Sequence, residues 1–142
     1  MTTLLADAKL GVMVVDSSIT DDDRIWPGKK VFRIKGSLIG FAGDYEEGMQ
    51  FLKWFKGGCL IEEKPRFKET DALVLCDKGL IFFTFQTLEP RKVDGGIYSI
   101  GTGGKAAICA YEALGFTDPT KAVRIVCKHD AGSRPPIRTY KL

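Results

Sequence analysis

Residues 2–16 of the chain, TTLLADAKLGVMVVD, predict how the fold begins. The stretch contains two short apolar runs with several β-branched residues, at 2–6 and 11–16, and residues 7–10 can connect them as a hairpin. The second run ends on Asp16, an acidic residue in an otherwise apolar strand. We therefore expect the chain to open with an antiparallel strand pair that carries a carboxylate at one end.

Further strands and helices follow in runs rather than in strict alternation. The predicted strands lie at 30–34, 38–42, 71–76, 80–85, 97–100 and 137–141, with another short one around Val93. A polar loop is expected over 17–28, and helices are expected over 105–114 and 119–128. Residues 59–70 show little hydrophobic periodicity. Runs of antiparallel strands separated by helices favour an α+β fold, with sheets packed on each other and helices outside.

Asp44 begins the first predicted helix. It is a good N-cap residue, and Glu47 three positions later completes the spacing of a capping box. Apolar residues then recur with helical period up to the glycines at 57–58, and they are Met49, Leu52 and Phe55.

Length and composition set the broad class. The 142 residues suit one domain, 1–142, because a chain of this size can bury one sizeable core. Its 44% apolar and 27% charged residues are typical of a globular protein. No apolar run approaches the about 20 residues that a membrane span needs, and the first residues lack the pattern of a secretory signal. We therefore expect a cytoplasmic protein without a membrane partner.

Cysteines and charges argue against several kinds of partner. The four cysteines form no CxxC pair and His129 stands alone, so we expect neither a metal nor another cofactor. Cys76, Cys109 and Cys127 lie in apolar stretches, which predicts small buried thiols in a reducing compartment. The Lys and Arg behind the net charge of +3 are spread along the chain, so no nucleic-acid partner is expected.

Thr2 is a candidate nucleophile if Met1 is removed. A small residue after the initiator methionine generally permits its removal, and the product carries a free α-amine and a hydroxyl on one residue. An α-amine has a pKa of about 7.7–8.0, so a useful fraction is neutral near physiological pH and can accept the proton of the attacking oxygen. The alternative interpretation, an ordinary start followed by two strand-forming residues, stays open at this point.

Two further features could serve such a nucleophile. Strand alternation puts Asp16 on a core-facing row, and Lys30 begins the next strand pair on a row with Phe32 and Ile34. A Lys–Asp pair would satisfy both charges, and the ammonium would lower the pKa of a nearby amine or hydroxyl. A structural ion pair is the alternative.

Residues 40–43, GFAG, precede the first helix. A glycine at a strand-to-helix turn lets a backbone N–H point outward near the positive end of the helix, which suits an oxyanion hole. A simple turn is the other interpretation.

Together these pieces resemble a known family. Five short segments of this chain look like the ordered motifs of proteasome β-subunits, and still more like those of the bacterial HslV-type peptidase. They are Thr2-Thr3, Val15-Asp16, 28–31 (GKKV), 40–43 (GFAG) and 100–104 (IGTGG). The similarity is closest over 2–55 and resumes over 71–128. The tail segment 130–133, DAGS, resembles the Asp-x-x-Ser of the β-subunits.

The resemblance implies a role for each matching residue. Thr2 would be the nucleophile and, through its α-amine, the base. Asp16 and Lys30 would form the charge pair that tunes and orients it, and Gly43 would donate its backbone N–H to the oxyanion.

Three more site residues follow from the same resemblance. Thr102 falls where the family usually has Ser, and Asp130 and Ser133 would support the N-terminal residue from the other side. The implied fold is a four-layer αββα sandwich of two antiparallel sheets, the N-terminal-nucleophile hydrolase fold. The implied activity is hydrolysis of protein or peptide substrates through an ester on Thr2, in a homo-oligomeric ring that an ATP-dependent unfoldase can serve.

The chain departs from the family pattern in two places. Thr102 keeps the hydroxyl but adds a β-branch that stiffens the position. Residues 59–70 are too short and irregular for the second long helix of the family, so we expect the fold to lack that helix and its ring contacts. Three other functions remain open from the sequence, namely a non-catalytic assembly subunit on this fold, an N-terminal-nucleophile amidase acting on a small amide, and a binding module with a basic tail.

Overall fold

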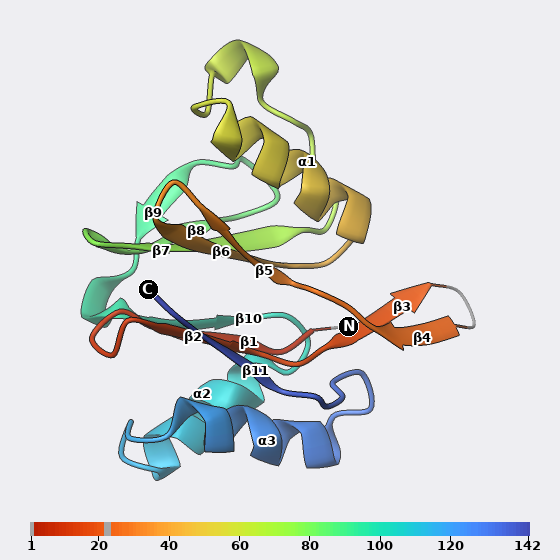
Figure 1. Cartoon of the computed structure of the whole chain (residues 1–142), viewed down its shortest axis with the longest axis vertical. Coiled ribbons are helices and arrows are strands. Elements are labelled where there is room, and N and C mark those ends of the chain that lie inside the picture. The colour runs from red at the N-terminus through yellow and green to blue at the C-terminus, as the bar shows by residue number, and fades with distance from the viewer. Residues whose placement is uncertain (1, 22–23) are drawn as a thin grey trace.

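The computed structural model describes residues 2–21 and 24–142. Its elements are arranged in four layers, with a helix on one side, two facing sheets in the middle and two helices on the other side (Figure 1). Helix α1 (Tyr45–Lys56) covers one sheet, and α2 (Gly104–Ala113) with α3 (Pro119–His129) covers the other. The predicted α+β class and the αββα layering are therefore confirmed.

The sheet beside α2 and α3 has the strand order β10-β1-β2-β11 and is antiparallel throughout. Its strands are β1 (Leu4–Asp7), β2 (Val12–Val15), β10 (Ile97–Ile100) and β11 (Arg138–Lys141). Leu4 lies opposite both Val15 and Ile100. Because β1 is central, the residues just before it are held between the end of β2 and the end of β10.

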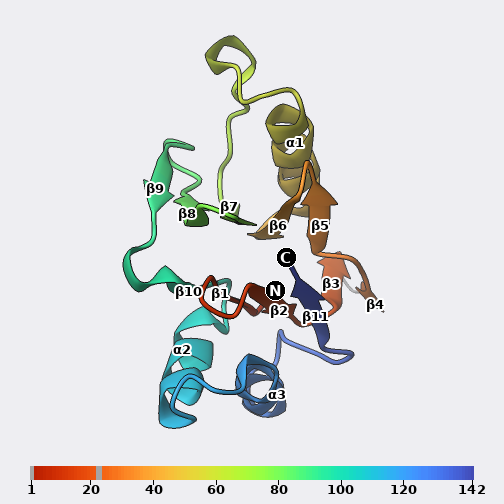
Figure 2. The same ribbon diagram turned by 60° about the vertical axis from the view of Figure 1, so that its left-hand side comes forward.

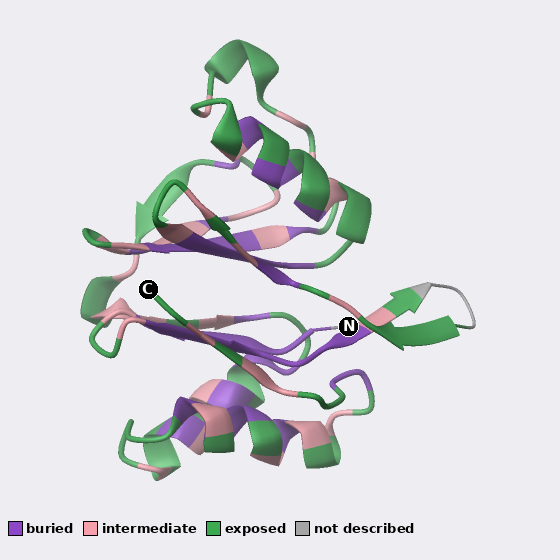
Figure 3. Ribbon diagram, viewed as in Figure 1, coloured by how far each residue is buried: buried purple, intermediate pink, exposed green. Residues whose placement is uncertain are grey.

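The second sheet runs in sequence order from β5 to β9 and is also antiparallel. Its strands are β5 (Val31–Ile34), β6 (Ser37–Ala42), β7 (Asp71–Cys76), β8 (Gly79–Phe83) and β9 (Pro90–Lys92). One apolar cluster fills the space between the sheets, and two more lie under α1 and under α2 with α3. Figure 3 shows that the buried residues concentrate in the two facing sheets.

The expected loop over 17–28 is instead a hairpin, so this prediction was wrong. Strands β3 (Ser18–Asp21) and β4 (Arg24–Pro27) pair with each other, with Ser18 opposite Pro27. The hairpin projects from the body of the molecule (Figure 1), and every residue of β4 is exposed. An exposed hairpin needs no apolar alternation, so the pattern that reveals buried strands was absent.

The strand expected around Val93 is displaced by a few residues. Strand β9 ends at Lys92, and a short 3-10 turn, η2 (Asp94–Gly96), follows Val93. The Val93 N–H still donates to the Leu80 carbonyl at 2.9 Å, which ties this segment to β8.

Helix α1 begins as predicted, and two of the three residues that gave its helical period face the core. The Asp44 carboxylate accepts the Glu47 N–H at 2.9 Å, which confirms the N-cap. Leu52 is buried and Phe55 is partly buried, whereas Met49 is exposed although it follows the same period. The buried face is set by Gly48, since a Cβ there would lie 2.2 Å from the Phe41 ring.

The segment between α1 and β7 has no second long helix. Its described residues form only the short 3-10 helix η1 (Ile61–Glu63) and extended chain, which Figure 2 shows rising above the sheet. The Trp54 indole N–H donates to the Leu60 carbonyl at 2.8 Å and holds the turn against α1. The expected loss of one helix is confirmed.

Two general findings complete the fold. Within residues 2–21 and 24–142, none of the helices has the length and apolar character needed to cross a membrane. The prediction of buried thiols was wrong for Cys109, which is exposed, whereas Cys76 and Cys127 are partly buried.

Candidate active site

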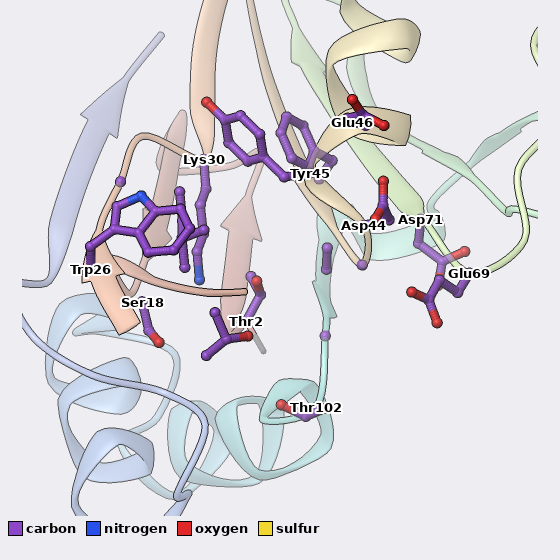
Figure 4. A pocket seen from close by; sticks show the side chains of 17 residues that line it. Thr2, Ser18, Trp26, Lys30, Asp44, Tyr45, Glu46, Glu69, Asp71 and Thr102 are labelled. Atoms are coloured by element: carbon purple, nitrogen blue, oxygen red, sulfur yellow. The ribbon is translucent and has the colours of Figure 1, made fainter. Parts of the chain in front are cut away.

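A cleft of about 1120 Å³ opens between the two sheets at the end where β1 begins and β6 ends. Of the predicted site residues, Thr2, Lys30, Gly43 and Thr102 line it. Figure 4 shows Thr2 and Thr102 on one side of the cleft, with the Lys30 ammonium end pointing toward the level of Thr2. Asp16 is completely buried beside this cleft rather than in its lining.

Asp16 collects donors from four segments of the chain. One carboxylate oxygen accepts the Thr3 N–H at 2.9 Å and the Lys30 ammonium at 3.0 Å. The other accepts the backbone N–H groups of Ser18 at 3.0 Å and Arg134 at 3.2 Å. A buried carboxylate with this many donors fixes the groups around it.

Lys30 is nearly as deeply buried as its partner. Its side chain is 4% exposed, and its ammonium forms an ion pair with Asp16. Burial lowers the pKa of Lys30 from its ordinary value, while the negative charge of Asp16 acts in the opposite direction. The ammonium is therefore held in the cleft lining by its ion pair with Asp16, which solvent screens little because both side chains are buried.

The pairing of Asp16 and Lys30 arises differently from the expectation. Both residues lie just beyond strand ends, Asp16 after β2 and Lys30 before β5, so strand alternation does not govern their side chains. Val14 packs toward α2 and α3, whereas Phe32 packs toward α1, so the two predicted rows face opposite layers. The side chains meet because both strand ends lie at the same edge of the sandwich.

Ser133 and Asp130 support the N-terminal segment through Thr3 rather than through Thr2. The Ser133 hydroxyl donates to an Asp130 carboxylate oxygen at 2.5 Å and also lies 2.5 Å from the Thr3 hydroxyl oxygen. Thr3 is fully buried and pairs with Asp16 through its backbone as well. The structure therefore fixes Thr2 mainly by fixing the residue that follows it.

Two glycines let the turn after β10 approach the first residues closely. A Cβ on Gly101 would lie 2.0 Å from the Thr2 carbonyl oxygen, and a Cβ on Gly103 would lie 1.8 Å from the Thr3 hydroxyl oxygen. The Gly103 N–H donates to the Thr2 carbonyl at 3.4 Å. Any larger residue at either position would displace the segment that carries Thr2.

Gly43 and Thr102 both belong to the cleft lining. Gly43 has a φ of +127°, a region that favours glycine, and a Cβ there would lie 2.6 Å from the Glu69 carbonyl oxygen. Thr102 is exposed in the turn before α2, and within the described residues it makes no hydrogen bond to Thr2. The structure thus brings both residues to the cleft that Thr2 lines.

Sequence reasoning missed several residues of the site. Thr3 was treated only as part of a motif, and Ser18 fell in the supposed loop. Ser18 lines the cleft, and its buried hydroxyl has no hydrogen-bond partner within the part of the chain that the structure describes. The Asp-x-x-Ser pattern and the paired threonines were the available signals, but neither shows which threonine is bonded.

The donor set of the site suits acid–base chemistry more than metal binding. Among residues 2–21 and 24–142, no group of three or more His, Cys, Asp or Glu side chains converges in a way that could hold a metal ion. Cys127 lies near both Asp16 and Lys30, and burial with the charges of Asp16 and Asp130 raises the pKa of its thiol to about 11. A thiol with that pKa is almost entirely protonated at neutral pH and is a poor nucleophile.

No protein-family model matches the sequence, and no curated protein sequence matches it either. Solved structures do resemble it over nearly its whole length. Eukaryotic HslV from Trypanosoma brucei has a TM-score of 0.76 at 21% identity, and the comparison covers 97% of each chain.

Two further solved structures agree with that likeness. Thiobacillus denitrificans BPH, solved in complex with epoxomicin, has a TM-score of 0.73 at 13% identity over 99% of this chain and 97% of its own. An Anbu (Gly-1) mutant from Hyphomicrobium sp. strain MC1 has a TM-score of 0.70 at 14% identity over 99% of this chain and 82% of its own. The chain therefore has the fold of HslV, which is the N-terminal-nucleophile hydrolase fold.

Proposed function

We propose that this protein is a threonine peptidase of the HslV and proteasome β-subunit family, which uses Thr2 as its nucleophile once Met1 has been removed. The observation that supports this most is the buried Asp16, which binds the Thr3 N–H and the Lys30 ammonium beside a cleft that Thr2 lines. A chain that needed this hydrogen-bonded network only for stability would not require a hydroxyl residue next to it in an open cleft. Met1 itself lies outside the described residues.

In the first half of the proposed reaction, the Thr2 hydroxyl attacks the carbonyl carbon of a substrate amide. Its proton passes to the α-amine of Thr2, because that amine is the base closest to the hydroxyl. The Gly43 N–H, at the start of α1, is proposed to donate to the oxyanion that forms. When the tetrahedral intermediate collapses, the C–N bond breaks and the ammonium returns its proton to the leaving amine.

The second half releases the acyl group. Water attacks the ester carbon and gives its proton to the same α-amine, and the bond between the acyl carbon and the Thr2 oxygen then breaks. The threonine oxygen regains the proton, so the enzyme returns to its starting state and the product is a carboxylic acid. No cofactor enters this sequence of steps.

Lys30 and Asp16 are proposed to tune this reaction rather than to exchange protons in it. A buried ammonium near the nucleophile favours the neutral form of the Thr2 amine and stabilises negative charge on the attacking oxygen. Asp16 keeps that ammonium in place and fixes the Thr3 backbone at the same time.

The assembly is a separate part of the proposal. A homo-oligomeric ring in the cytoplasm would give the peptidase an enclosed chamber, with an ATP-dependent unfoldase as a partner that delivers proteins. Leu60 and Ile61, two large apolar residues after α1, are exposed and support an additional contact between copies. Light scattering coupled to gel filtration should give a mass of several copies, whereas a monomer would overturn the ring.

Hydrolysis of a fluorogenic peptide library tests the activity itself. Thr2→Ala and Lys30→Ala should each abolish turnover while the circular-dichroism spectrum stays that of the parent. Lys29→Ala is the matched control, because Lys29 is exposed and lies 5.1 Å from the Phe32 ring centre instead of in the ion pair. Turnover that survives in Thr2→Ala would exclude Thr2 as the nucleophile.

A further inference from the structure

We propose that the cleft selects peptide substrates with a basic side chain, Lys or Arg, near the bond that is cleaved. This inference rests on the proposed peptidase function and names the substrate class of that site. Three observations support it. They are the negative charge of the cleft wall opposite Thr2, the hydrogen bonds that hold this wall together, and the aromatic and hydroxyl groups that line the same cleft.

Carboxylates dominate the charged part of the cleft lining. Two come from the start of α1 and two from the entry to β7, and they are Asp44, Glu46, Glu69 and Asp71. The described lining contains only one basic residue, Lys30, whose charge is paired with Asp16. The lining is therefore acidic although the chain as a whole carries a net charge of +3. A cleft lined by one sign of charge concentrates ligands of the opposite sign.

The acidic wall is held together by bonds between two segments far apart in the sequence. The Glu47 carboxylate accepts the backbone N–H groups of Lys68 at 2.8 Å and Glu69 at 3.4 Å. The Thr70 hydroxyl donates to the Asp44 carbonyl at 3.2 Å. These bonds keep the start of α1 beside residues 68–71, so the four carboxylates stay on one side of the cleft, as Figure 4 shows.

Groups that suit the rest of a long basic side chain line the same cleft. The aromatic rings of Trp26 and Tyr45 are 41% and 40% exposed and face the cleft (Figure 4). Aromatic rings can cover the aliphatic stem of Lys or Arg and attract its cation. The Ser18 hydroxyl is an independent sign of an occupant, because it is buried in the lining without a partner within the described residues.

The arrangement favours an extended cation over a metal ion. Within the described chain no three acidic, His or Cys side chains converge on one point, so the wall offers separate carboxylates rather than a coordination shell. A side chain with its charge at the end of a flexible stem can reach one or two of these carboxylates from a peptide held at Thr2. Basic peptides therefore fit the wall better than neutral or acidic ones.

The test compares peptides that differ at one position. Fluorogenic substrates carry Lys, norleucine or Glu at each of the three residues before the reporter group. We expect kcat/KM to be about tenfold higher for Lys than for norleucine at one of these positions, as for a charge partly shielded from water. The ratio should fall as salt is added, since solvent ions screen exposed carboxylates.

Paired substitutions decide whether the wall causes the preference. Glu46→Gln with Glu69→Gln should reduce the ratio of Lys to norleucine turnover to about twofold or less. Glu62→Gln with Glu63→Gln is the matched control, because these exposed acids lie in η1 outside the cleft lining. A ratio that favours norleucine or Glu, or that changes only in the control pair, would overturn the inference.

A binding measurement separates this inference from the proposed activity. The Thr2→Ala variant should bind fluorescein-labelled Lys peptide more tightly than its norleucine counterpart, by fluorescence anisotropy. If Thr2→Ala shows this preference while the parent protein hydrolyses none of the peptides, the result would support the acidic cleft and contradict the peptidase. Equal affinities would overturn the inference even if the peptidase activity were found.

Discussion

The two sides of the cleft are built in opposite ways. On the side of Thr2, the residues Thr3, Asp16, Lys30 and Ser133 are at most 4% exposed and are joined to one another by hydrogen bonds. On the other side, Asp44, Glu46 and Glu69 are exposed, and their positions are held mainly by bonds to the backbone near them, with the Asp44 carboxylate capping α1.

Under the proposed function, this difference separates the residues that would act on the bond from those that would select the substrate. Groups that act on a developing charge must be in place before the reaction, which requires burial and many bonds. Groups that attract a substrate can remain solvated, because attraction over several ångströms does not need fixed geometry. Substitutions on the Thr2 side should therefore affect stability and turnover, whereas substitutions on the acidic wall should affect the choice of substrate.

The largest effect is expected at Asp16. Asp16→Ala leaves the Lys30 ammonium buried without its partner, so the free energy of unfolding should fall by about 3–5 kcal/mol in urea titrations. Glu69→Gln on the acidic wall should change it by less than about 0.5 kcal/mol. Adding Lys30→Met to Asp16→Ala should recover part of the loss, and a double variant less stable than Asp16→Ala would contradict the unpaired charge as the cause.

A similarly direct effect on turnover is expected at Gly101. Gly101→Ala would place a Cβ 2.0 Å from the Thr2 carbonyl, so Thr2 must move and kcat should fall about 100-fold. Gly36→Ala is the matched control, because Gly36 also has a positive φ, of +78°, but has no atom within 4 Å of the added Cβ. Equal losses in the two variants would mean that backbone strain, rather than contact with Thr2, is responsible.

A smaller effect is expected at Thr3. Thr3→Val keeps the shape of the side chain but removes the contact with the Ser133 hydroxyl, so stability should fall by about 1 kcal/mol. Turnover should fall as well if Thr3 positions the nucleophile. Thr87→Val, at an exposed position far from the cleft, provides the comparison in the same thermal and kinetic assays. A stable variant with full activity would show that the Ser133 contact is dispensable.

The smallest effect is expected for the Cys127 thiol, which lies near Asp16 and Lys30. The Cys127 thiol has a pKa of about 11, so on the order of one molecule in a thousand carries the thiolate at pH 8. Iodoacetamide should modify exposed Cys109 well before Cys127, and the Cys127 rate should rise about tenfold per pH unit up to the pKa. Peptide mapping by mass spectrometry measures both rates, and equal rates at pH 8 would contradict the buried environment.

The sequence predicted the layers and brought together the Thr2 side of the cleft better than the acidic wall. Thr2, Asp16 and Lys30 could be named as candidates because they lie in ordered motifs that resemble those of a known family. The hydrogen bonds of Thr3 and Asp16 with backbone groups leave no sequence pattern, so their roles could not be predicted. The hairpin of β3 and β4 was missed because β4 is exposed throughout and the hairpin shows no apolar alternation.

The acidic wall could not be predicted for a different reason. It joins residues 44–46 to residues 69–71, and the segment between them has no regular pattern from which its path could be inferred. The bonds that bring the two together start from Glu47, whose spacing predicted a reciprocal capping box. In the structure that side chain bonds to Lys68 and Glu69 instead.

The intact mass of the purified protein, before and after treatment with an epoxyketone such as epoxomicin, is the decisive test of Thr2 as the nucleophile. An epoxyketone reacts with the amine and the hydroxyl of an N-terminal threonine together. Our account predicts a chain that lacks Met1 and gains a single adduct, with no adduct in Thr2→Ala. A chain that retains Met1 and gains none, or an adduct that persists in Thr2→Ala, would contradict Thr2 as the nucleophile of this protein.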